Sequence, residues 1–284
     1  MKNCSYSIPL MLIIRITSHS FNTKFLDRRS GYQFIGAAEA LILAFIFISL
    51  FLLLILQKKH SMYTYIYLLI TLLILIIVQH RSVLVAITIT SIFICLWFYK
   101  SSPKLLISLI IIFTITLFFI NTSSFYMTFI QSINNSLTFL SDPYKDASGS
   151  WRLTGWTQRL KQVWEKDPVF GEGLGGYSEW YVGNTLLRVA VHNGYIMNFA
   201  KFGLLGIFLL LGTILCWYKE MITYVIEEID INYRYLGYVT MFCVLAHCVF
   251  TFFYEFTIFF WIFLGIGTVL KKQSAYNFND SSEN

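Results

Sequence analysis

The sequence predicts an all-α protein that crosses a membrane several times, and three features of its 284 residues lead to that prediction. Hydrophobic residues make up 57% of the chain. Charged residues make up only 13%, against roughly 25% in ordinary soluble domains. Phe and Tyr are frequent, with 27 and 18 copies, while Pro is rare, with 4. A soluble domain of this length could not bury so much apolar surface, and the same features exclude disordered, collagen-like, coiled-coil and disulfide-stabilised proteins.

Seven apolar runs are candidate membrane spans, because a helix needs about 20 residues to cross the hydrocarbon core. Four precede a long polar interval and three follow it: 40–56, 62–78, 83–99, 105–120, 195–218, 235–251 and 253–270. The last two form one tight hairpin around Tyr254 and Glu255. The expected organisation is 36–120 for spans one to four, 121–194 for a large periplasmic loop, 195–270 for spans five to seven and 271–284 for a cytoplasmic tail.

Lys and Arg residues in the short loops give the orientation, because cytoplasmic loops carry an excess of both. Eight of them fall on one face of the predicted topology: Lys58, Lys59, Lys100, Lys104, Lys219, Arg234, Lys271 and Lys272. In the short turns of the opposite face there is only Arg81. We therefore expect a multi-pass membrane protein with its C-terminus in the cytoplasm and the long segment 121–194 outside, which is the periplasm in a cell with two membranes. Membrane lipids, and not nucleic acid, are then the partners that explain the formal net charge of +6.

Residues 1–35 fit this topology less well than the rest. They would be an extracytoplasmic segment, yet they carry five basic residues: Lys2, Arg15, Lys24, Arg28 and Arg29. A short re-entrant helix is one explanation. The other, which we favour, is that a longer relative has spans upstream of this segment that this chain lacks.

The external loop is expected to hold a small folded unit on the membrane surface, because it contains four of the seven Trp residues and balanced charges. Apolar side chains recur at helical spacing from Arg152 to Trp164, which predicts an amphipathic helix that Asp167-Pro168 ends. Arg152 and Arg159 are seven residues apart and so share one face, where guanidinium groups could bind phosphate. The alternatives are ordinary solvated charges and an interfacial belt of Trp residues.

Gly171, Gly173 and Gly176 match the G-x-G-x-x-G pattern of dinucleotide-binding loops, but the match is coincidental. That mechanism needs a strand before the glycines and a βαβ unit around them, and the preceding Pro168-Val169-Phe170 provides neither. A tight turn, or a close approach of the backbone to a ligand, explains the glycines better.

Ionisable side chains beside membrane spans are functional candidates, because a charge in the bilayer is costly. The predicted topology gathers six of them near the outer face: Glu39, His80, Arg81, His192, Lys201 and Glu255. The alternative for His80 and Glu255 is an interfacial position in contact with water, and for Lys201 it is snorkelling. His192 and Arg81 are the strongest candidates of the six.

His247 lies four residues after Cys243 and directly before Cys248, a grouping that could mimic a metal site. Two thiols and one imidazole without an acidic fourth ligand make that interpretation weak. We expect instead a buried His that is hydrogen-bonded within the membrane region.

Four short motifs lie on the predicted outer side of the membrane. They are Gln79-His80-Arg81-Ser82, Ser150-Trp151-Arg152, the segment Asp167-Pro168-Val169-Phe170-Gly171-Glu172-Gly173, and His192-Asn193 followed after nine residues by Gly203-Leu204-Leu205-Gly206. Their order, spacing and side resemble the signature of the O-antigen ligase and O-antigen polymerase family, in which an external His-Asn pair begins a membrane helix. The resemblance covers 36–215. Family members usually have more than seven spans, and many have Glu where Lys201 stands, so this chain departs from the pattern at both points.

The resemblance implies a metal-independent, inverting glycosyltransferase of the GT-C-like membrane class that uses no cofactor. Its donor is a glycan on undecaprenyl diphosphate, presented at the outer leaflet of the inner membrane. An O-antigen ligase transfers the glycan to lipid A–core in lipopolysaccharide biosynthesis, whereas an O-antigen polymerase transfers it to another lipid-linked repeat unit. The shared motifs leave both open, with a slight preference for the ligase.

The chemistry of this reaction assigns roles to the candidate residues. The leaving diphosphate develops negative charge that fixed arginines stabilise, and a His that titrates near the ambient pH takes the acceptor proton. The catalytic candidates are His192, Arg81 and Arg152. The candidates for substrate binding are Arg159, Arg188, Asn193, Trp156 and Gly173. The external loop contains no D-x-D pair, in agreement with a site that uses Arg in place of a divalent metal ion.

Two alternatives of other classes remain open. A transporter or flippase for a lipid-linked sugar would show internal repeats and ionisable residues through the bilayer midplane, and the sequence shows neither. An inactive, truncated member of the family is the second alternative, because the chain is short.

Overall fold

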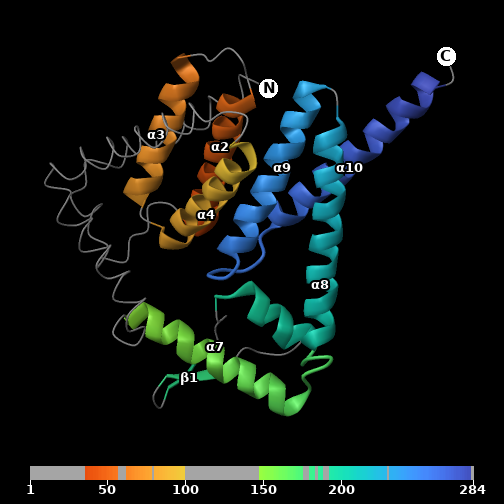
Figure 1. Ribbon diagram of the computed structural model, residues 1–284. Coiled ribbons are helices and arrows are strands. Elements are labelled where there is room, and N and C mark those ends of the chain that lie inside the picture. The colour runs from red at the N-terminus through yellow and green to blue at the C-terminus, as the bar shows by residue number, and fades with distance from the viewer. Residues whose placement is uncertain are drawn as a thin grey trace, which may run out of the picture. The chain divides into compact units, whose positions relative to one another are not determined.

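A computed structural model describes residues 36–56, 62–78, 80–99, 147–174, 179–182, 185–187, 192–228 and 230–282 of the protein (Figure 1). In chain order the described elements are α2 (Ala37–Leu56), α3 (Met62–Val78), α4 (Arg81–Phe98), α7 (Ala147–Lys166), β1 (Trp180–Val182), β2 (Thr185–Leu187), α8 (Gly194–Glu227), α9 (Ile231–Phe250) and α10 (Ile258–Ser282). They belong to two compact units. The helical unit holds α2, α3, α4, α9, α10 and the end of α8 from residue 217. The loop unit holds α7, both strands, the start of α8 and the turn at 251–255.

Within the described residues, three helices are long and apolar enough to cross a membrane, namely α2, α8 and α9. Two shorter apolar helices accompany them, Met62–Leu75 within α3 and Ser82–Phe98 within α4. An apolar helix satisfies its backbone hydrogen bonds internally and can therefore lie in the hydrocarbon core. The prediction of a helical, multi-pass membrane protein is confirmed, whereas the number of seven spans stays a prediction.

The apolar runs of the sequence locate the described helices well. Six of the seven predicted spans fall in described residues, and α3 has the predicted bounds of 62–78. α8 extends past the predicted end at 218 to Glu227, because hydropathy marks the edge of the membrane and not the end of a helix. The predicted start of the last span at 253 is wrong, because residues 251–257 are not helical and α10 begins at Ile258. The span predicted at 105–120 lies outside the described residues.

The core of the helical unit is built around α2, which is apolar on all sides and packs against α3, α4 and α9. α9 packs in turn against α4 and α10. The one charged residue of α2, Glu39, accepts the N–H of Gly36 (3.0 Å) and thereby caps the start of that helix.

His247 of α9 is fully buried in this core. Its Nε2 lies 2.7 Å from the hydroxyl of Thr257, and the rings of Phe45, Phe256 and Phe260 surround it. The prediction of a buried, hydrogen-bonded His is confirmed. Among the described residues, no group of three or more His, Cys, Asp or Glu side chains is arranged to hold a metal ion.

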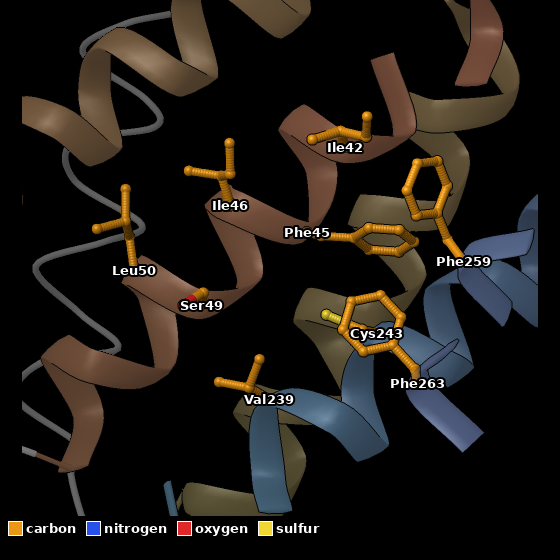
Figure 2. Close-up of a pocket in the computed structure, with 9 residues that line it drawn as sticks. All are labelled: Ile42, Phe45, Ile46, Ser49, Leu50, Val239, Cys243, Phe259 and Phe263. Atoms are coloured by element: carbon orange, nitrogen blue, oxygen red, sulfur yellow. The ribbon is translucent and has the colours of Figure 1, made fainter. Parts of the chain in front are cut away.

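An apolar pocket of about 290 Å³ opens between α2, α9 and α10 of the helical unit (Figure 2). Phe45, Phe259 and Phe263 form much of its wall. Ser49 and Cys243 are its polar lining residues, and the Ser49 hydroxyl is 2.6 Å from the hydroxyl of Tyr235.

The loop unit is a small folded body, as the Trp-rich composition predicts. Val163 of α7 packs with Phe199 and Ala200 of α8 in its apolar core. β1 and β2 form an antiparallel hairpin, with Tyr181 opposite Leu186. This hairpin is an addition to the all-α prediction, because strands of three residues are too short to show an alternating pattern.

The hairpin is fixed to α7 by side chains of that helix. The side-chain amide of Gln158 donates from Nε2 to the carbonyl of Tyr181 and accepts the N–H of Tyr181 at Oε1, both at 2.7 Å. Gln162 donates to the carbonyl of Glu179 (3.0 Å). The amphipathic helix predicted at 152–164 is confirmed, with Asp167 directly after its last residue.

Candidate active site

Segment 168–173 docks onto α8 at a point where the helix is broken. Gly203 has φ 63° and ψ −160°, so the helical hydrogen-bond ladder is interrupted there. Four backbone hydrogen bonds of 2.8 to 3.2 Å join segment and helix, from Leu204 to Pro168, Leu205 to Val169, Glu172 to Ala200 and Gly173 to Lys201. These bonds satisfy the backbone groups that the break leaves without helical partners.

The docking depends on two glycines with positive φ, Gly171 (73°) and Gly203. A Cβ on Gly171 would lie 2.6 Å from the backbone nitrogen of Gly203 and 2.8 Å from the carbonyl oxygen of Ala200. A Cβ on Gly203 would overlap the carbonyl of Val169. The glycine-rich motif therefore serves a close backbone approach, and what it approaches is a helix of the same chain.

Arg159 reinforces this junction from α7. Its side chain is only 4% exposed and forms an ion pair with Glu172, which is 10% exposed. Its Nη1 also donates to the side chain of Gln162 (3.1 Å), and Lys166 lies 3.9 Å from the Glu172 carboxylate. The charge of Arg159 is thus compensated inside the protein, although the sequence analysis predicts a contact with substrate.

His192 stands directly before α8 in a strained conformation. Its φ of 48° is the only positive φ among the described residues other than glycine. Asn193, which is 4% exposed, caps the helix by accepting the N–H groups of Tyr195 and Ile196 (3.1 Å each). The His-Asn pair therefore holds the imidazole at a fixed helix start.

The turn at 251–255 is tied to the same helix start. The N–H of Gly194 is shared between two carbonyls of the turn, those of Thr251 (2.9 Å) and Tyr254 (2.8 Å). The ring of Phe252 packs on Tyr195, with 4.7 Å between centroids. Backbone and side-chain contacts together place the turn beside His192.

Two rings lie close to the imidazole of His192, and two charged side chains act on it electrostatically. The Trp151 ring lies 5.6 Å away between centroids, and the Tyr254 ring lies 6.0 Å away. The guanidinium carbon of Arg152 lies over the Tyr254 ring, 5.8 Å from its centroid. The exposed carboxylate of Glu255 acts on His192 electrostatically. We call these five residues the His192 cluster.

The surroundings of His192 lower the pKa of its imidazole. Partial burial contributes most, because it disfavours the charged form, and the positive charge of Arg152 acts in the same direction. The carboxylate of Glu255 opposes both. The imidazole is therefore neutral at neutral pH and can accept a proton.

Of the predicted catalytic residues, the structure brings His192 and Arg152 together through the ring of Tyr254. Arg81 begins α4 in the helical unit. The structure describes its backbone but not its side chain. His80, directly before it, is buried, and its carbonyl accepts the N–H groups at the start of α4. Arg188 also lies outside the described residues.

Three of the residues predicted to bind substrate have other contacts in the loop unit. Arg159 pairs with Glu172, and Asn193 caps α8. The N–H of Gly173 donates to the carbonyl of Lys201 in α8. Trp156 is half-buried on α7.

Tyr254 is the residue of the cluster to which the sequence analysis gave no role. The sequence places Tyr254 beside Glu255 in an external turn, but no sequence pattern indicates that its ring contacts His192 and Arg152.

A family model described as O-antigen ligase matches residues 66–211, which is half of the chain. The matched residues include Arg81, Arg152 and His192, whereas the 251–255 turn lies beyond them. A search of the curated proteins finds no match.

Proposed function

The chain belongs to the O-antigen ligase family, whose members are generally enzymes acting on lipid-linked glycans, and on that premise we propose that it is a membrane glycosyltransferase. Its donor in this proposal is a glycan on undecaprenyl diphosphate, and its acceptor is lipid A–core. The reaction takes place at the periplasmic face of the inner membrane, and the full fold has about seven spans in a GT-C-like arrangement.

The proposed chemistry is a metal-independent displacement at the anomeric carbon. The acceptor hydroxyl oxygen forms a bond to that carbon while the bond from the carbon to the lipid diphosphate breaks. The bonding electrons leave with the diphosphate, and the hydroxyl proton passes to the imidazole of His192. Attack from the side opposite the leaving group inverts the configuration.

His192 is suited to the role of general base. Its lowered pKa keeps the imidazole neutral, so that it can accept the proton. Its positive φ is a strained conformation for a residue with a side chain, and such strain is concentrated at functional sites.

Arg152 is suited to stabilising the leaving diphosphate. Within the described part of the chain, no carboxylate forms an ion pair with it, so its charge remains available to an anion. We propose Arg81 and Arg188 as further diphosphate contacts and Trp156 as a surface for a sugar ring. For Asn193 and Gly173, the contacts described above favour positioning of the site over contact with substrate.

The observation that carries this proposal is the meeting of His192 and Arg152 at the ring of Tyr254. A base for the acceptor and a cation for the leaving group are the two functions that a metal-free glycosyl transfer needs. The two residues come from different elements of the loop unit, so their proximity is a property of the fold.

A deletion strain tests the proposal by its surface-polysaccharide profile. Loss of all polymer from lipid A–core is the expected result for the ligase, and restoration by the wild-type gene but not by His192→Ala would support the site. Core that bears one repeat unit would instead identify a polymerase. An unchanged profile would contradict both.

A further inference from the structure

Tyr254 contacts both proposed catalytic side chains. Resting on the proposed function, we infer that Tyr254 is a positioning residue whose ring holds Arg152 beside His192 for glycan transfer. The residue lies beyond the part of the chain that the family model matches.

The contacts of the ring are the first support. The guanidinium carbon of Arg152 lies 5.8 Å from the ring centroid, within the range of a cation–π interaction. The imidazole of His192 lies 6.0 Å from the same centroid. Trp151, the neighbour of Arg152 in α7, contacts His192 from the helix (5.6 Å). The start of α7 and the 251–255 turn therefore each contribute one ring to the imidazole.

The backbone fixes where this ring lies. The carbonyl of Tyr254 accepts the N–H of Gly194 at 2.8 Å, only two residues after His192 in sequence. The carbonyl of Thr251 accepts the same N–H at 2.9 Å, so both ends of the turn are tied to the start of α8. The position of the Tyr254 ring relative to His192 is thus set by short covalent and hydrogen-bonded paths.

An aromatic ring suits this task better than a carboxylate would. A carboxylate would neutralise Arg152, as Glu172 does for Arg159, and the charge would no longer be available to a diphosphate. The face of a ring attracts the guanidinium group through its quadrupole but carries no net charge. Tyr254 can therefore fix Arg152 in place while its positive charge stays available to the leaving group.

The test uses the purified full-length protein and measures glycan transfer from undecaprenyl diphosphate to lipid A–core. Tyr254→Leu removes the ring and should lower the rate about 100-fold, because a misplacement of about 1 Å can cost that much. Tyr254→Phe keeps the ring and should retain most of the activity. Tyr181→Leu is the matched control, and it should leave the rate unchanged because Tyr181 is 51% exposed on β1 of the loop unit, outside the His192 cluster.

The pH profile gives a second readout, which follows the position of Arg152 relative to His192. The charged groups that act on His192 are Arg152 from α7 and Glu255 from the turn. If Tyr254→Leu releases Arg152, the pKa of His192 loses its cationic depression, and the acid limb of the profile should move to higher pH. Tyr254→Phe should leave the limb in place.

A double-mutant cycle keeps the inference testable even if Tyr254→Leu is less stable than the wild type. When Tyr254 acts through Arg152, adding Tyr254→Leu to Arg152→Gln should cost little more than Arg152→Gln alone. Additive losses would overturn the inference, as would an unchanged rate in Tyr254→Leu or an equal loss in Tyr254→Phe. Inactive wild-type protein, or full activity in His192→Ala, would instead contradict the proposed function.

Discussion

Arg152 and Arg159 lie on the same helix, seven residues apart, yet the loop unit places them in opposite environments. Arg159 is buried, paired with Glu172 and supported by Gln162. Arg152 is half-buried and lies over the ring of Tyr254. Among the described residues it has no carboxylate partner, in contrast to Arg159.

The difference separates a structural cation from one that is available for chemistry. A buried arginine with a compensating carboxylate fixes the fold, because removing either partner leaves an uncompensated charge. An arginine held by an aromatic face keeps its charge for a ligand. Two regions of α8 differ in the same way. At Gly203, backbone hydrogen bonds to segment 168–173 close the contact. At the start of the helix, the polar side chains of the His192 cluster stay partly accessible.

The largest effect on stability is expected at the Arg159 junction. Glu172→Ala leaves Arg159 buried without its partner and should cost about 3 to 5 kcal/mol of folding free energy. The apparent melting temperature of the detergent-solubilised protein measures this. Glu165→Ala is the control, because the exposed pair of Glu165 with Lys161 (3.7 Å) should contribute less than about 0.5 kcal/mol. Equal melting temperatures for the two variants would contradict a structural role for the pair of Arg159 with Glu172.

The opposite behaviour is expected at Arg152. Arg152→Gln should lower the rate of glycan transfer about 100-fold to 1000-fold, as does the loss of one donor that stabilises an oxyanion, and should leave the melting temperature unchanged. Single-turnover transfer by the purified protein is the measurement. A variant that melts early but transfers at the wild-type rate would reverse the assignment of the two arginines.

A smaller loss of stability is expected from Gly203→Ala. The new Cβ meets the backbone of Val169, and a positive φ is strained for Ala, so the variant should lose about 2 kcal/mol or more. Gly212→Ala, in the same helix, has nothing within 4 Å of its Cβ and should be neutral or stabilising. Equal thermal stability of the two variants would show that the docking of 168–173 is not required.

The smallest expected effect is a shift in pH dependence. Glu255 raises the pKa of His192 against the depression by burial and Arg152, so Glu255→Gln should lower that pKa further. A base acts in its neutral form, and transfer in this variant should therefore persist to lower pH than in the wild type. The acid limb of kcat/KM measures the shift. Movement towards higher pH would contradict the electrostatic contact.

The sequence alone predicts the elements that depend on local composition. Apolar runs locate the membrane helices because lipid excludes charge over a fixed thickness, and helical spacing locates α7 because one of its faces packs in a core. It predicts the start of the last helix wrongly, because Phe252, Phe253 and Phe256 extend the apolar run through the non-helical residues 251–257.

The contacts between elements could not be predicted in this way. Helical spacing places Arg152 and Arg159 on one face, but the partner of Arg159 comes from segment 168–173, whose position depends on the break at Gly203. The glycine pattern indicates a close backbone approach without identifying what is approached. The resemblance of the motifs gave His192 and Arg152 as candidates, whereas the ring that both contact lies in a turn without a recognisable motif.

The most direct test of the central claim is the rate at which purified His192→Ala transfers a labelled glycan from undecaprenyl diphosphate to lipid A–core. Loss of the general base should lower that rate by about 100-fold or more relative to the wild type, with an unchanged melting temperature. Transfer by His192→Ala at the wild-type rate would contradict the assignment of the His192 cluster as the active site.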